Sequence, residues 1–158
     1  MPAQSSSASL WLTLAAAIAL VWLGMVVGVS FIATPVKFAA ASLTRPVAFD
    51  VGGVTFALFS RIEWGVCALL AITLLIARPR RIALAMLALL IAIILLQCLW
   101  LLPELNLRAA AVIAGKPLPP SIHHGVFAAI ELLKVLLLAA LAAGNLWHLS
   151  NSKSAAVR

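Results

Sequence analysis

The chain has 158 residues, of which 65% are hydrophobic and 9% are charged. A water-soluble domain of this length does not need so much apolar surface, so the composition indicates an integral membrane protein and argues against a soluble globular domain. The net charge of +7 does not indicate a nucleic-acid partner, because the basic residues are spread over loops at both ends of the apolar runs. Both cysteines, Cys67 and Cys98, lie in apolar segments, so no disulfide framework and no CxxC motif is present.

Four apolar runs predict one membrane domain with four spans, at residues 10–33, 56–77, 82–102 and 124–147. The expected fold is an all-α four-helix bundle with short interfacial helices in the two outer loops. The first span contains Gly24 and Gly28 in a GxxxG element, which favours close packing against a neighbouring helix of the same bundle. The tail, residues 150–158, is polar and is expected to be flexible.

The two longer loops carry the expected interfacial helices. Residues 36–53 include Lys37, Arg45 and Asp50 and are too polar for a span, so we expect a connector with a short helix and a turn at Gly52–Gly53. The other loop follows Pro103, which should kink or end the third span. Residues 104–114 then predict a short amphipathic helix.

The tightest loop decides the predicted orientation. It carries Arg78, Arg80 and Arg81, so the positive-inside rule places it in the cytoplasm. With four spans, both termini are then cytoplasmic too. We expect a multi-pass protein of the plasma membrane, the inner membrane in a bacterium.

The last span begins with an unusual set of polar residues. Pro119 and Pro120 precede Ser121, a good N-cap, so a helix should start near residue 122. On that helix His124 and Glu131 lie about 20° apart, and His123 and Lys134 also lie about 20° apart. Thirteen residues between Lys134 and His148 cover only about 20 Å, so the span must reach back and include Glu131 and Lys134.

Buried polar residues on other spans lie at a similar depth. Counting from the cytoplasmic ends, Glu63 is about 22 Å deep, Gln97 about 24 Å and Lys134 about 21 Å. Arg61, Glu131 and Ser30 come out near the same height. Because a lone charge in the membrane is costly, we expect two pairs, Glu63 with Lys134 and Arg61 with Glu131. The pairs could instead serve only helix packing, or the Arg and Lys side chains could snorkel to the surface.

Three segments carry a resemblance to a known family. They are the run Gly28 to Val36, the block Leu96 to Pro103 with Arg108, and Ser121 to His124 with Glu131 and Lys134. Together they are similar to the small four-helix membrane proteins related to transmembrane protein 205, and the similarity covers most of residues 20–138. The resemblance implies a four-span domain with polar residues at Gln97, Arg108, one of the two histidines, Glu131 and Lys134. It implies no activity.

These observations define one candidate binding cluster in the outer leaflet. Its predicted members are Arg61, Glu63, Gln97, Arg108, His123, His124, Glu131 and Lys134. The function we predict is binding or moving a small solute or ion. One alternative is a membrane redox or cofactor protein that ligates haem or a metal through His123 or His124.

Another alternative is a structural subunit of a membrane complex. Besides the lipid bilayer, a second copy or a membrane partner is then expected to contact the chain. No nucleophile elbow, phosphate loop, HExxH or paired-carboxylate motif occurs in the sequence, which does not favour an enzyme. No cofactor is predicted.

Overall fold

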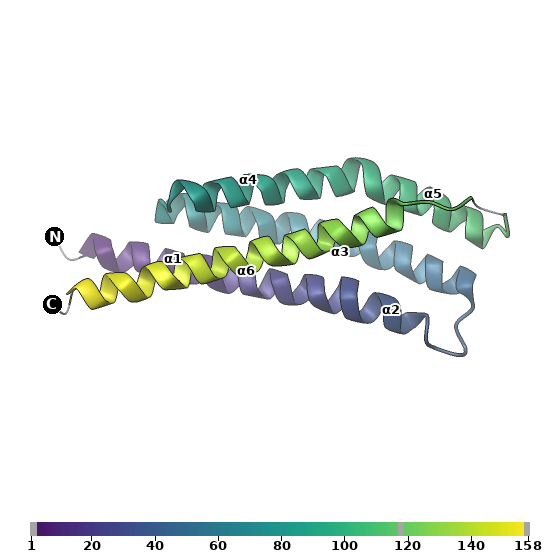
Figure 1. Ribbon diagram of the computed structural model, residues 1–158, viewed down its shortest axis with the longest axis horizontal. Helices are drawn as coiled ribbons and strands as arrows, with labels where there is room; N and C mark the ends of the chain where they lie inside the picture. The colour runs from purple at the N-terminus through teal and green to yellow at the C-terminus, as the bar shows by residue number, and fades with distance from the viewer. Residues whose placement is uncertain (1–2, 117–118, 157–158) are drawn as a thin grey trace.

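The computed structural model describes residues 3–116 and 119–156, with side chains for residues 7–116 and 119–151. Four long rods lie side by side (Figure 1). The first combines α1 (Ala3–Val26), the π-helical segment η1 (Val27–Ala33) and α2 (Thr34–Lys37). The second is α3 (Arg45–Ala77), and the third combines α4 (Arg81–Leu96), the π-helical η2 (Gln97–Leu101) and α5 (Leu102–Ile113). The fourth is α6 (His123–Ala156), and the described residues contain no strand.

Each of the four rods contains a stretch that is long and apolar enough to cross a membrane. These stretches are residues 7–37, 45–77, 81–113 and 123–151. Large apolar side chains such as Leu69, Leu99 and Leu136 are more than half exposed on the outside of the bundle. Exposed leucine at this density is expected where lipid, and not water, surrounds the helices. The expected all-α four-helix bundle is confirmed, and the chain is a multi-pass membrane protein.

The four rods pack in a ring. Helix α1 packs against α3 and α6, and α4 closes the ring by packing against the same two helices. Small side chains let α1 approach its neighbours, since Ala15, Ala16 and Ala19 are at most 1% exposed. The GxxxG element does not serve this purpose, because a Cβ added at Gly24 or Gly28 would meet nothing within 4 Å. The interpretation of that element as a packing site is therefore wrong.

The connector between the first two rods is shorter than the sequence predicts. Helix α3 begins at Arg45, with Pro46 in its first turn, and runs through Gly52–Gly53 without a turn. The predicted turn there is wrong, because helical glycine costs only about 1 kcal/mol and is tolerated where space is short. Space is short at Gly52, where an added Cβ would collide with the side chain of Lys37.

Both π-helical segments lie just before a proline. Pro35 follows η1 in α2, and Pro103 follows η2 in α5. Proline lacks a backbone N–H and its ring clashes with the preceding turn, so a local widening of the helix lets the chain continue. The expected short helix at residues 104–114 is thus present as α5, a direct extension of the third span. The expected separate helix within residues 36–53 is wrong, because this segment contains only the end of α2 and the beginning of α3. Helix α6 likewise continues to Ala156, through most of the predicted tail.

One end of the bundle carries both termini and the basic turn between α3 and α4 (Figure 1). Arg78 makes this turn tight by adopting a left-handed conformation with φ 50°. The other end carries the extensions α2 and α5 and the loop before α6. Polar residues at the two ends are therefore separated by the length of the bundle.

Candidate functional site

The bundle interior contains a charged pair between α3 and α6. The Lys134 ammonium donates to Glu63 Oε1 at 2.6 Å, and the exposed fractions of the two residues are 0% and 4%. Both side chains project into the interior of the ring. The structure brings together the two residues of the first expected pair.

A second carboxylate contacts the same ammonium. Glu131 lies one turn before Lys134 on α6, and its Oε1 is 2.6 Å from Lys134 Nζ. Gln97 Nε2 donates to that oxygen at 2.6 Å, and Ser30 Oγ donates to Oε2 at 2.6 Å. Glu131 thereby links three of the four rods.

The two neutral donors to Glu131 both come from π-helical segments, Ser30 from η1 and Gln97 from η2. A π-helical turn rotates the following residues relative to a regular helix, and such turns recur at functional sites. Each proline lies one to two helical turns after the side chain that contacts Glu131. The local widening that Pro35 and Pro103 require also determines where Ser30 and Gln97 point.

Sequence reasoning overlooked one member of this group. Trp22 is fully buried on α1, and its indole N–H donates to Glu63 Oε1 at 2.9 Å. The available indication was its position, because Trp22 lies in the middle of the first predicted span, residues 10–33. A buried indole N–H needs an acceptor, and in an apolar span a carboxylate is a strong candidate. The residues joined by these contacts form the polar cluster: Trp22, Ser30, Glu63, Gln97, Glu131 and Lys134.

Arg61 does not belong to the polar cluster. Its side chain is exposed on α3, and Glu131 bonds Lys134, Gln97 and Ser30 in place of the expected Arg61. Two residues two positions apart on a helix point about 200° apart, so Arg61 and Glu63 cannot both face the interior. The expected pair of Arg61 with Glu131 is therefore wrong.

Arg108 and His123 also lie outside the polar cluster. Arg108 Nη2 donates to the carbonyl of Pro119 and so ties α5 to the loop before α6. His123 is half-buried, with its ring edge against Trp100 at a centroid distance of 5.9 Å and Nδ1 2.9 Å from Ser121 Oγ. Ser121 Oγ also accepts from the backbone N–H of His123, as expected for a residue that caps α6.

His124 faces a different space from His123. It lines a cavity of about 400 Å³ between the first rod, α3 and α6. We call it the aromatic cavity, after the four phenylalanines in its wall: Phe31, Phe38, Phe56 and Phe127. Glu131 and Ser30 supply polar groups to the same wall. His124 and Glu131 share this face of α6, and Glu131 belongs to the cavity and to the polar cluster alike.

The charges of the polar cluster do not balance. With all groups ionised, Glu63 and Glu131 carry two negative charges and Lys134 carries one positive charge. An unbalanced charge is costly in the membrane and attracts a positive group or a proton. Among the described residues, no three His, Cys, Asp or Glu side chains group as a metal site requires.

The fold and this site define a class: a small multi-pass membrane protein whose four helices enclose a buried ionic cluster. Residues 14–111 match the family model described as Domain of unknown function (DUF4149). Since that match covers more than half of the chain, the protein belongs to this family. No curated protein and no solved structure matches the chain.

Proposed function

We propose that this protein binds a small cation in the aromatic cavity, with Glu131 as its counter-charge. The observation that carries the proposal is the position of Glu131, which completes the polar cluster and lines the cavity. A cation in the cavity would balance the second carboxylate.

The cavity wall favours a cation with an apolar surface. Aromatic faces attract cations through their ring quadrupoles, and the attraction grows when water is excluded. Phe56 and Phe127 pack edge to face, with their ring centroids 5.2 Å apart, and form one part of the wall. Phe31 is 38% exposed, so that side of the cavity is reached from outside the bundle. Small ammonium compounds combine the charge and the apolar surface that this cavity would accommodate.

We further propose the plasma membrane as the location, with both termini in the cytoplasm. The basic turn and both termini lie at one end of the bundle, which agrees with that orientation (Figure 1). The aromatic cavity would then open in the outer half of the membrane.

We also propose that this protein is related to the membrane proteins that resemble transmembrane protein 205. The segments that resemble the proteins related to transmembrane protein 205 include η1, η2 and the start of α6, and these segments supply Ser30, Gln97, Glu131 and Lys134. We propose that the polar cluster is the feature that such proteins share.

Calorimetric titration of the detergent-solubilised protein tests the function, with tetramethylammonium and sodium chlorides as probes. Saturable binding of at least one cation is expected. Glu131→Gln should weaken it by about tenfold or more, the factor for one charged contact. Phe31→Leu should weaken only tetramethylammonium.

Glu104→Gln is the matched control, because Glu104 lies on α5 and does not line the aromatic cavity. It removes the same charge and should leave affinity unchanged. Failure of both cations to bind the wild-type protein would refute the proposal. Wild-type affinity in the Glu131→Gln protein would refute it as well.

A further inference from the structure

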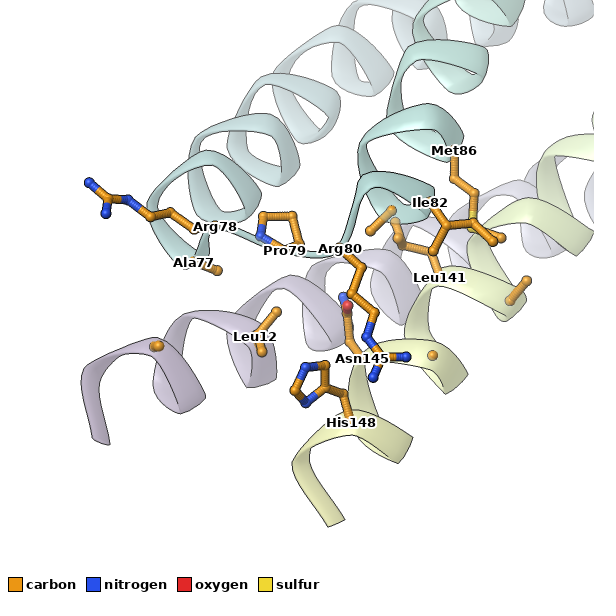
Figure 2. Close-up of a pocket in the computed structure, with 14 residues that line it drawn as sticks. Leu12, Ala77, Arg78, Pro79, Arg80, Ile82, Met86, Leu141, Asn145 and His148 are labelled. Atoms are coloured by element: carbon orange, nitrogen blue, oxygen red, sulfur yellow. The ribbon is translucent and has the colours of Figure 1, made fainter. Parts of the chain in front are cut away.

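A second cavity lies at the opposite end of the bundle, between α1, α6 and the basic turn (Figure 2). Its volume is about 480 Å³, and we call it the basic-end cavity. Its inner wall is apolar and comes from α1, α4 and α6, where Leu12, Ile82, Met86 and Leu141 contribute side chains. The polar cluster contributes no residue to it.

Asn145 on α6 supplies an unusual polar group to this wall. The residue is 6% exposed, and among the described residues its amide nitrogen has no hydrogen-bond partner. A buried N–H without an acceptor destabilises a fold. An acceptor on a bound molecule would satisfy this donor.

The other polar side chains of the wall are basic. Figure 2 shows the Arg80 guanidinium and the His148 imidazole on the same side of the cavity as Asn145. The Arg78 guanidinium points the other way, away from these groups. No carboxylate is among the lining residues in the described part of the chain, so the wall presents donors and positive charge without a counter-ion.

We propose that the basic-end cavity binds a phosphate group, presented by a lipid headgroup or by a soluble phosphate compound. Phosphate oxygens are strong acceptors that match the fork of donors on an arginine, and Asn145 would supply one further donor. The site lies where apolar spans give way to a basic turn, which is the depth of phospholipid headgroups. The apolar inner wall would contact the hydrocarbon part of a lipid.

Native mass spectrometry of the whole chain in mild detergent tests this site. The probes are dioleoylphosphatidylglycerol, inorganic phosphate and dioleoylglycerol, the last of which has the same chains without phosphate. Phosphatidylglycerol or inorganic phosphate should bind in a stoichiometric complex, and dioleoylglycerol should not. Competition by inorganic phosphate against the lipid would assign the site to free phosphate, and its absence would assign it to the lipid.

Three variants decide whether the bound phosphate occupies this cavity. Arg80→Gln and Asn145→Leu should each weaken binding by about tenfold, the factor for one lost charge-assisted hydrogen bond. Arg78→Gln removes the same charge from the same turn but should leave binding unchanged, because that side chain points away.

Asn145→Leu should also raise the melting temperature of the ligand-free protein, since it removes a buried donor without a partner. This readout separates lost binding from lost folding. Equal weakening in Arg78→Gln and Arg80→Gln would show a diffuse charge effect and overturn the proposal. Wild-type binding by the Asn145→Leu protein would overturn it too, as would binding of dioleoylglycerol as tight as that of phosphatidylglycerol.

Discussion

Lys134 contacts both carboxylates of the polar cluster, and it is fully buried. Such an arrangement is stable only while the partners remain together, because each charge has left water and depends on the others. Trp22, Gln97 and Ser30 add neutral donors to the carboxylates. The cluster therefore depends most on Lys134, because removing this side chain leaves both buried carboxylates without a positive partner.

We expect Lys134→Met to lower the free energy of unfolding by about 3–5 kcal/mol, the usual cost of breaking a buried ion pair from one side. The double variant with Glu63→Gln should recover part of that loss, since one of the two orphaned carboxylates is gone. Unfolding in detergent by titration with sodium dodecyl sulfate measures both.

Arg61→Gln is the control for this prediction. Arg61 is exposed on the same helix as Glu63, and its substitution should change stability by less than about 0.5 kcal/mol. A loss in Lys134→Met as small as that in Arg61→Gln would contradict a coupled cluster.

Helix ends and irregular turns shape this molecule at the scale of its elements. The π-helical segments η1 and η2 let two prolines continue their rods and place Ser30 and Gln97 near Glu131. At the other end, α3 stops because Arg78 turns left-handed and Pro79 follows it. A left-handed conformation costs a residue with a side chain about 1–2 kcal/mol, and glycine avoids this cost.

We expect Arg78→Gly to raise the free energy of unfolding by about 1 kcal/mol, because it relieves the left-handed strain at the end of α3. Arg80→Gly removes the same charge two residues later, where the backbone is extended with φ −61° and ψ 150°. It should lower stability by roughly 0.5–1 kcal/mol through the added freedom of the unfolded chain. Melting curves recorded without added phospholipid compare the stability of the two variants. Stability changes of the same sign in Arg78→Gly and Arg80→Gly would contradict this account.

The whole bundle separates two kinds of polar site along its length. The aromatic cavity and the basic-end cavity have no lining residue in common. The carboxylates lie in the interior of the ring, while the basic turn lies at the end with both termini. Orientation in the membrane therefore decides which solution each site meets.

Cysteine labelling tests the orientation in a background with Cys67→Ala and Cys98→Ala. A membrane-impermeant maleimide added to intact cells should label Lys116→Cys and should not label Asn151→Cys, because these exposed positions lie at opposite ends of the bundle. Pro79→Cys, in the basic turn, should behave like Asn151→Cys. Labelling of all three from outside would contradict a four-span topology with cytoplasmic termini.

The sequence alone was sufficient to predict the four apolar helices and the common depth of the buried polar groups in the membrane. Hydropathy is summed along the chain, and a helix rises about 1.5 Å per residue, so both quantities follow from counting. The same counting placed Glu63, Gln97, Glu131 and Lys134 at one level, and their side chains do meet.

Only the tertiary structure decided which way each helix faces. The depth of a residue along a helix does not show which way its side chain points. Arg61 and Glu63 therefore have similar predicted depths, although Glu63 faces the interior of the bundle and Arg61 is exposed. Trp22 joined the cluster for the same reason, because the close fit of alanines on α1 orients its indole toward Glu63. The two cavities also arise from packing, since each is enclosed by residues from at least three separate segments. The rotation of each helix and the enclosure of each cavity depend on contacts between residues far apart in the sequence. Counting residues along one helix cannot predict such contacts.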